Sequence, residues 1–333
     1  MKTVNINEGI LITFLDFLKE GIIIVDEESK TIEFVNRFAK KFLKNEDYVG
    51  KNFKEVIDND YITSLISYNQ DKEVKAEVNI DNQKYLINVY KIEGKKIIHL
   101  QDITPFEVYK QAKKDFVSNV SHELKTPISV LKSAVETLEE EKDPVMIKKF
   151  LDIAKKRIDQ MDHLINDLLI LARLESQEDQ VKKEHYNLYK QIEDIFEDLK
   201  HLTQEKNITL INQVPKNFVI YADEQKLSIA LKNLVENAIK YNKQDGKVIV
   251  NAVKDSKNVT ISVEDTGIGI PEESIPLVFE RFYRVDKSRS RNIGGTGLGL
   301  SIVKHITEAH KGKVWVESKL GKGSKFYIRI PNS

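Results

Sequence analysis

A helical pattern that begins at Phe106 and continues for about seventy residues constrains the fold more than any other feature of the chain. The segment Glu141-Lys142-Asp143-Pro144 interrupts it, with Asp143 as a candidate N-cap and Pro144 as the first helical residue. Apolar residues recur at steps of three and four at Phe116, Val120, Leu124, Leu131, Val135 and Leu138, then at Ile147, Leu151, Ala154, Ile158, Met161, Ile165, Leu168 and Ala172. The pattern therefore predicts two long helices in a hairpin.

Two helices alone cannot cover both of these apolar stripes. The economical solution is a four-helix bundle made by a homodimer. The alternative is a hairpin that packs on neighbouring domains of its own chain.

The chain has 333 residues, a length typical of two or three domains. Residues 1–104 are expected to form a small mixed α/β module that Pro105 closes, and the hairpin takes residues 105–176. In the first module we predict strands at 22–25, 31–35, 75–80, 84–92 and 96–100, and short helices at 36–43 and 53–67.

A polar linker at 175–184 leads to a third module, residues 177–333, of mixed helices and strands. Helices are predicted at 188–206, 223–242, 272–283 and 298–311, and strands at 208–213, 218–221, 247–253, 258–264, 313–318 and 325–330.

Composition excludes several function classes. Lys plus Arg equals Asp plus Glu, at 52 each, so no basic excess points to a nucleic-acid partner. Cysteine is absent, which excludes disulfides, thiolate metal sites and cysteine nucleophiles. No apolar run approaches the ~18 residues that cross a bilayer. We therefore expect a cytoplasmic chain, alone or as the cytoplasmic part of a longer membrane sensor.

The string from Phe116 to Pro127 carries the first candidate site. Counted around the helix from Val120, His122 faces solvent, with Glu123 beside it and Thr126 one turn further on the same face. A neutral imidazole can attack phosphorus while a carboxylate holds its tautomer and accepts its proton. Pro127 is expected to kink the helix. The plainer interpretation is a surface His beside a surface Glu.

The segment from Asn233 to Tyr241 lies late in a predicted helix. Asn233, Asn237 and Lys240 fall on one stripe, whose amide oxygens and ammonium suit a hydrated magnesium ion and phosphate oxygens. A polar outer helix face is the alternative.

Nine of the fourteen glycines lie between Gly267 and Gly323. Asp265, at a strand end, can accept a hydrogen bond from the amino group of a base such as adenine, and Gly267 and Gly269 would let the backbone approach a flat ligand. The stretch 294–300 precedes a helix and suits phosphates, although it fits neither the P-loop nor the Rossmann spacing. The polar run 280–291 is either a lid over the ligand or a surface loop.

Together these strings resemble the sensor histidine kinases of bacterial two-component systems. Ser121–Pro127 resembles the phosphorylated-histidine box, Asn233–Tyr241 the Asn box, Asp265–Gly269 and 294–300 the two glycine boxes, and Glu280–Arg284 the Phe box. Residues 1–104 resemble a PAS domain, through the order of elements and Gly21, Asp26, Asn36 and Asp102-Ile103-Thr104. The fold expected from the resemblance is multidomain α+β: a PAS-like sensor, a four-helix-bundle hairpin and an α/β-sandwich ATP-binding domain of the Bergerat (GHKL) type.

The resemblance also implies a mechanism. His122 would attack the γ-phosphate of ATP with Glu123 as base, and the phosphoryl group would pass to an aspartate in the receiver domain of a response regulator. Thr126 would serve a phosphatase activity toward that regulator. Asn237, helped by Asn233, would hold Mg²⁺. The other residues implied to bind ATP are Lys240, Tyr241, Asp265, Gly267, Gly269, Arg284, Gly295, Thr296, Gly297, Leu298 and Gly299.

Two other classes of protein share parts of this pattern. An ATPase of the same nucleotide fold, such as a chaperone or topoisomerase, would lack the histidine box and would carry a catalytic acid at the position of Asn233. A PAS and coiled-coil interaction module would not need the nucleotide boxes. A small-molecule ligand in the PAS-like module stays open, while the lack of cysteine excludes a flavin–cysteine photoadduct. We expect His99 to be a structural or surface histidine, with a haem ligand as the alternative.

Overall fold

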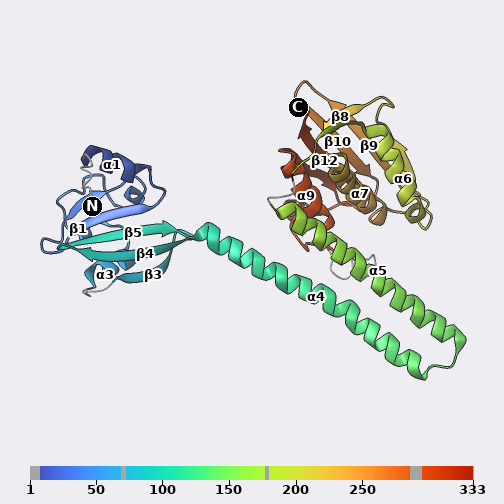
Figure 1. The fold of residues 1–333 in the computed structure, drawn as a ribbon, viewed down its shortest axis with the longest axis horizontal. Helices are drawn as coiled ribbons and strands as arrows, with labels where there is room; N and C mark the ends of the chain where they lie inside the picture. Colours follow the sequence, from blue (N-terminus) through green and yellow to red (C-terminus); the bar gives the residue numbers. More distant parts are fainter. Residues whose placement is uncertain (1–7, 69–72, 177–179, 286–294, 333) are drawn as a thin grey trace, which may run out of the picture. The chain divides into compact units, whose positions relative to one another are not determined.

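The computed structural model describes residues 8–68, 73–176, 180–285 and 295–332 (Figure 1). The chain divides into two compact units, Met1–Val117 and Ser118–Ser333. Within the described residues, no helix combines the length and the apolar character needed to cross a membrane. Each unit is described by itself.

The first unit is built on one antiparallel sheet with the order β2-β1-β5-β4-β3. The strands are β1 (Gly21–Asp26), β2 (Ile32–Val35), β3 (Val74–Ile80), β4 (Gln83–Ile92) and β5 (Lys95–Asp102). Alternate residues of the central strands, such as Ile23, Ile87 and Ile98, are fully buried. The alternation thus places the predicted strands correctly.

The helical segments of this unit are shorter than the sequence suggested. The 36–43 segment holds only a 3₁₀ turn, η1 (Ala39–Phe42), and 53–67 divides into α2 (Phe53–Val56) and α3 (Asp60–Ser67). Asn52 and Asn59 each accept a backbone N–H at the start of these helices, so two N-caps split one predicted helix.

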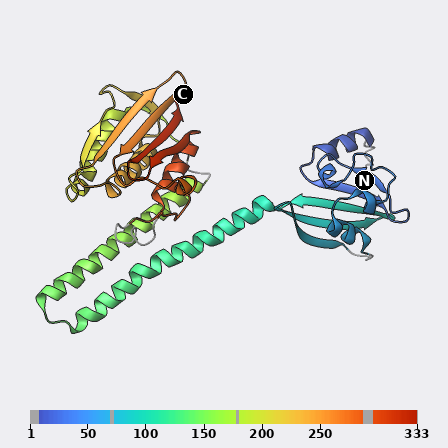
Figure 2. The same cartoon turned by 180° about the vertical axis from the view of Figure 1, so that it is seen from behind.

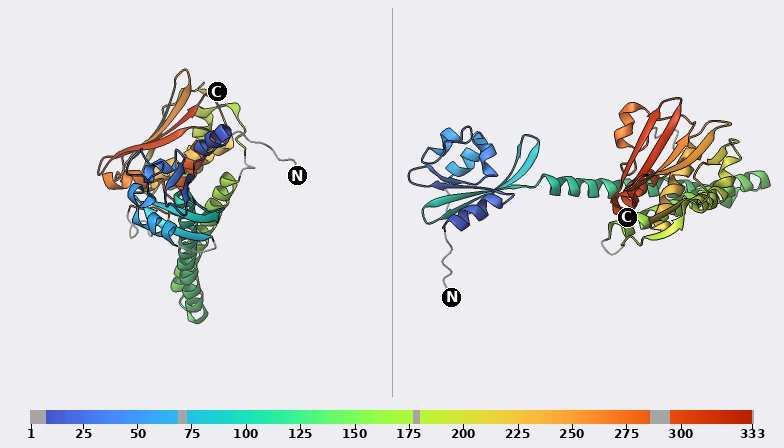
Figure 3. Two further views of the ribbon diagram at one scale, coloured as in Figure 1. Left: turned by 90° about the vertical axis from the view of Figure 1, so that its left-hand side faces the viewer. Right: turned by 90° about the horizontal axis from the view of Figure 1, so that it is seen from above.

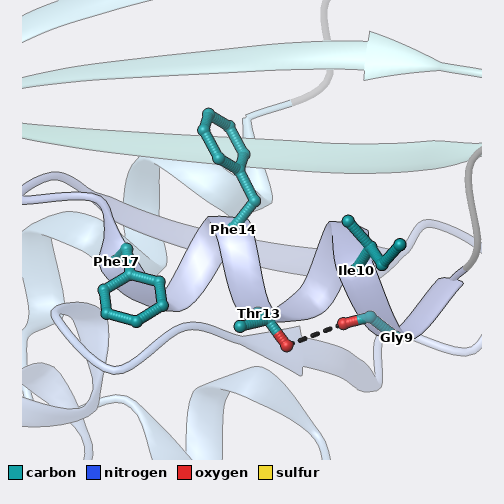
Figure 4. A pocket seen from close by; sticks show the side chains of 5 residues that line it. All are labelled: Gly9, Ile10, Thr13, Phe14 and Phe17. Atoms are coloured by element: carbon teal, nitrogen blue, oxygen red, sulfur yellow. Dashed lines mark hydrogen bonds between the residues drawn. The ribbon is translucent and has the colours of Figure 1, made fainter.

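Helix α1 (Glu8–Phe17) was not predicted. Its apolar residues follow one another without a polar face, so no helical period marks it. Ile10, Phe14 and Phe17 are largely exposed and, with Gly9 and Thr13, line an open hollow (Figure 4).

The hairpin consists of α4 (Thr104–Glu140) and α5 (Pro144–Glu175), which run antiparallel from the turn between them (Figures 1 and 3). Asp143 accepts the N–H of Val145 at 3.0 Å and Pro144 is the first residue of α5, as predicted. Pro127 lies buried inside α4, and the helix continues past it.

The apolar stripes of the hairpin are covered only in part. Leu164 and Leu171 of α5 are buried in the core of the second unit. Val135, Leu151 and Ile158 are each more than half exposed. Packing on the chain's own domain therefore covers one part of the hairpin, and a bundle with a second copy stays a prediction for the rest.

The remainder of the second unit is a layered α/β structure. Its sheet has the order β11-β12-β10-β9-β7, in which only the β7–β9 pair is parallel. The strands are β7 (Thr209–Asn212), β9 (Lys247–Lys254), β10 (Asn258–Asp265), β11 (Lys313–Lys319) and β12 (Gly323–Pro331). Helices α6 (Leu188–Thr203), α7 (Glu224–Lys240) and α9 (Gly299–Ala309) cover one face (Figure 2). This two-layer sandwich is the fold that the sequence predicted.

In this unit one local prediction was wrong and one strand was not predicted. The predicted helix 272–283 is only the 3₁₀ helix η2 (Glu272–Leu277), because Pro276 has no N–H to donate to a longer helix. The segment just after the predicted linker contains β6 (Glu184–Asn187), which pairs with β8 (Val219–Ala222). Four residues without clear alternation carry too little pattern for a strand to be predicted.

Candidate functional site

His122 lies on α4 with its side chain exposed, and so does Thr126 one turn later. The hydroxyl of Thr126 donates to the backbone carbonyl of His122 at 3.3 Å. Glu123 is partly exposed. The predicted solvent-facing arrangement of the imidazole and hydroxyl is confirmed.

Helix α7 starts at the N-cap Asp223, whose side chain accepts the N–H of Lys226. Its apolar face is buried, which leaves Asn233, Asn237 and Lys240 partly exposed at the rim. The Nζ of Lys240 pairs with Glu236 at 2.7 Å. The polar stripe predicted from the helical period is therefore present.

The amide of Asn233 is more constrained than that of Asn237. Its Nδ2 donates to the carbonyl of Ile229 at 2.9 Å. Its Oδ1 lies so close to Gly299 that a Cβ at position 299 would collide with it. A glycine at the start of α9 thus lets α9 approach the middle of α7.

Asp265 ends β10 and is 7% exposed. Its Oδ1 accepts the N–H of Gly267 at 2.8 Å. Burial raises the pKa of this carboxyl group to about 6, although the hydrogen bond from Gly267 acts in the opposite direction. A buried carboxylate that backbone N–H groups hold in place has lone pairs left for a ligand that brings its own N–H donor.

The close approaches at the first glycine stretch are made by the protein itself. A Cβ on Gly267 would collide with the carbonyl of Tyr241, and one on Gly269, at φ +70°, with that of Lys319. Ile268 also donates its N–H to the Tyr241 carbonyl at 3.1 Å. Gly267 thus lets the Asp265 turn lie against the end of α7, and Gly269 lets it lie against the end of β11.

The second glycine stretch is described from Gly295 onward; Gly294 and residues 286–291 of the run predicted to be a lid or a surface loop lie outside the described residues. A Cβ on Gly295 would lie 3.5 Å from the hydroxyl of Tyr241. Gly297 has a φ of +75°, and a Cβ on it would collide with the backbone of Phe282. Leu298 is fully buried, so its side chain belongs to the core. Helix α9 then begins without a side-chain cap, which leaves backbone N–H groups for an anion.

The hairpin contacts the segments around Arg284 and Thr296 through one residue of each of its helices. Arg284, 11% exposed, donates to Glu123 of α4 at 3.0 Å. The hydroxyl of Thr296 donates to Asp167 of α5 at 2.6 Å. The sequence placed Glu123, Arg284 and Thr296 in the site but missed Asp167, because only the packing of α5 on α9 brings it there.

A third contact lies at the end of α5. Arg281 pairs with Glu175, the last residue of that helix, and its guanidinium lies 3.0 Å from Nε2 of His305. Glu175 and His305 were also not predicted. The Phe-box segment thus contacts the hairpin through both of its arginines.

The donor set can be tested against the expected ligands. Among the residues described, no group of three or more His, Cys, Asp or Glu side chains could hold a metal ion. Mg²⁺ usually keeps several waters and binds substrate phosphates through few protein ligands, so the Asn237 amide fits it without such a cage. Asp265, Lys240 and the start of α9 supply one acceptor, one cation and free N–H groups, which match a base and its phosphates.

Two family models match the chain. The His Kinase A (phospho-acceptor) domain covers residues 112–177, and the histidine kinase-, DNA gyrase B- and HSP90-like ATPase covers 222–333. The first model contains the His122 string, and its match excludes the ATPases that lack a phosphoacceptor domain.

The sensor protein kinase WalK of Staphylococcus aureus is 33% identical over 339 residues, which are 94% of this chain and 79% of that relative. Other S. aureus sequences of the same name match at 33%, and the chain spans about half, 54%, of their length.

Two solved structures resemble the chain. The histidine kinase AdeS of Acinetobacter baumannii matches with a TM-score of 0.52 and 26% identity, over 64% of this chain and 98% of that one. The histidine kinase ThkA, solved in complex with the response regulator protein TrrA, matches with a TM-score of 0.55 over 98% and 99%; at 22% identity, this likeness concerns the fold alone. With the phosphoacceptor hairpin joined to the ATPase fold, these matches show that the chain belongs to the family of sensor histidine kinases, which are ATP-dependent protein-histidine kinases.

Proposed function

We propose that this chain phosphorylates itself on His122 with ATP and then passes the phosphoryl group to an aspartate of a response regulator. In the first step a ring nitrogen of His122 bonds to the γ-phosphorus, the bond from that phosphorus to the departing ADP oxygen breaks, and Glu123 takes the imidazole proton. The observation that carries the proposal is the 3.0 Å contact of Arg284 with Glu123, which joins the Phe box to the phosphoacceptor string.

ATP lies, in this proposal, between α7, the Asp265 turn and the start of α9. The carboxylate of Asp265 accepts from the adenine amino group, and Tyr241 lines the nucleotide beside Gly267 and Gly269. Lys240, Arg284 and the Gly295–Gly299 segment hold the phosphates. The uncapped start of α9 and the partial burial of Lys240 support this placement.

Mg²⁺ is held by Asn237, with Asn233 as its neighbour. When bound, the ion offsets charge on the phosphate oxygens and so lowers the barrier to transfer. Since Oδ1 of Asn233 lies against Gly299, Asn237 is the principal ligand of the two and Asn233 positions α9.

The active form is a homodimer, whose bundle covers the apolar residues that the hairpin leaves exposed, Val135, Leu151 and Ile158 among them. A receiver domain of a response regulator is the second partner; the complex of ThkA with TrrA supports this by analogy. Thr126, exposed beside His122, positions water in the reverse, phosphatase reaction.

The chain works as three parts in this proposal: a PAS-like sensor at 1–104, the phosphoacceptor hairpin at 105–176 and the ATP-binding domain at 177–333. The strand, strand, short helices and three strands of the first unit agree with the PAS resemblance. A small molecule is a candidate signal for it. The use of ATP and the absence of cysteine support work in the cytoplasm, alone or as part of a membrane sensor.

Incubation with γ-labelled ATP and magnesium tests the central step. The wild-type chain is expected to gain an acid-labile, base-stable label that His122→Ala abolishes. His201→Ala, which removes another exposed histidine, is the matched control and keeps the label. A label that survives His122→Ala would refute the assignment.

A further inference from the structure

Asp167 of α5 lies inside the region proposed for the nucleotide phosphates. Leu164 and Leu171, which share its face of the helix, are 4% and 1% exposed and anchor α5 in the core that includes α9. With the helix fixed in this way, Oδ2 of Asp167 lies 2.6 Å from the hydroxyl of Thr296.

The Asp167 carboxylate takes the hydrogen bond of the Thr296 hydroxyl, which a phosphate oxygen could otherwise accept. The hydroxyl of Thr296 also accepts the N–H of Leu298 at 3.2 Å, so it lies beside the N-terminus of α9. Burial raises the pKa of Asp167, and the charge of Glu236 adds to the rise, while the hydrogen bond from Thr296 and the charges of His163 and Lys240 oppose it. Phosphate oxygens arriving at this point would add further negative charge beside a carboxylate that is already poorly solvated.

The second hairpin contact has the same form. Arg284, which we assign to phosphate, is held by the carboxylate of Glu123. Each of these two proposed phosphate ligands is therefore engaged by an anion from the hairpin, Thr296 by Asp167 and Arg284 by Glu123.

We propose that the Asp167 carboxylate acts as a latch: it competes with the phosphates of the nucleotide for the hydroxyl of Thr296. Binding of ATP would then release the hairpin from the Gly295–Gly299 segment that leads into α9. This inference rests on the proposed function. Entry of ATP replaces the Asp167 carboxylate at Thr296 and the Glu123 carboxylate at Arg284. Glu123 becomes free to serve His122 only when phosphate is present.

Equilibrium binding to the full chain tests the latch, with Mg–ATP and adenosine as the two probes. Asp167→Asn keeps the size of the side chain and removes its charge, so ATP is expected to bind about tenfold more tightly, within the usual range of coupling between sites. Adenosine, which has no phosphate, is expected to bind unchanged. Asp167→Ala is a second variant that also removes the acceptor and should give at least the same gain.

Asp162→Asn is the matched control, because it removes the same charge from an exposed position of α5 and should change neither affinity. Unchanged or weaker ATP binding by both Asp167 variants would overturn the latch, as would an equal gain for adenosine. If wild type binds ATP and is labelled on His122 but the variants behave like it, only the latch fails. If wild type shows no label on His122, the proposed function itself fails.

Discussion

Asp265, which is buried, and Asp167, which is partly buried, are both carboxyl groups with a raised pKa, but they are held in different ways. Asp265 is fixed by the N–H of Gly267, two residues away in its own turn. Asp167 is held by the side chain of Thr296, which lies just before α9, on a different segment from α5. Asp265 accepts from the backbone N–H groups of Gly267 and Ser324, whereas Asp167 accepts from a side-chain hydroxyl group, which can rotate away.

The largest expected effect comes from the fixed group. Asp265→Ala should weaken ATP binding about 100-fold, because a buried charged acceptor is lost. Calorimetric titration of wild type and variant measures the change. Glu264→Gln, the preceding residue on β10, is the control and should bind ATP normally. An effect below threefold at Asp265 would contradict its assignment to adenine.

Substitution of Gly299 tests how closely the start of α9 packs against Asn233 of α7. Gly299→Ala places a methyl group against Oδ1 of Asn233, and we expect a loss of about 1–3 kcal/mol in the free energy of unfolding. Gly295→Ala, whose new Cβ would lie an ordinary 3.5 Å from the Tyr241 hydroxyl, should be tolerated. Denaturant unfolding compares the two variants, and restored stability in Gly299→Ala with Asn233→Ala would confirm the cause. Equal stability of both single variants would refute it.

The pKa of Asp265 predicts a pH dependence with a definite sign. Its carboxyl group takes up a proton as the pH falls through about 6, so ATP should bind about tenfold more weakly at pH 5 than at pH 7.5. The folded state also binds this proton more tightly than the unfolded state, so Asp265 lowers stability as the pH rises through 6. Asp265→Asn should flatten both profiles; a binding profile still falling at pH 5 in that variant would assign the titration to another group.

The smallest effect is expected for His310, which acts on the pH dependence of stability and not on ATP binding. Its Nε2 accepts the N–H of Asp223 at 3.1 Å and burial lowers its pKa. The unfolded state then binds more protons below its ordinary pKa of 6.5, so stability falls as the pH drops below that value. His310→Gln should reduce this slope in thermal melts, and His201→Gln, at an exposed site, should not. An unchanged slope would show that other groups control acid sensitivity.

The sequence was sufficient where a feature depends on neighbours along the chain. The Asp143 cap, the exposure of His122 and Thr126, and the stripe of Asn233, Asn237 and Lys240 all follow from helical geometry. The strands of the first unit likewise follow from a short apolar run at 22–25 and from strand-like patterns along the rest of the module. These predictions needed no knowledge of tertiary packing.

Features that depend on packing between distant segments were missed or shortened. Asp167 and Glu175 meet Thr296 and Arg281 only because α5 docks on α9, and no local pattern marks a docking carboxylate. Helix α1 was missed because it has no periodic polar face. The helix predicted at 272–283 is only η2, which contains Pro276. The glycines were located correctly, but Gly267 and Gly269 turned out to contact backbone carbonyls of the protein.

Helix α4 crosses the boundary between the two compact units without interruption. Its first residue is pinned to β4 through the hydroxyl of Thr104, which accepts the N–H of Lys84 at 2.7 Å. From there to His122 the chain makes about five helical turns and contains no glycine. One uninterrupted helix therefore carries both Thr104, which contacts β4, and His122.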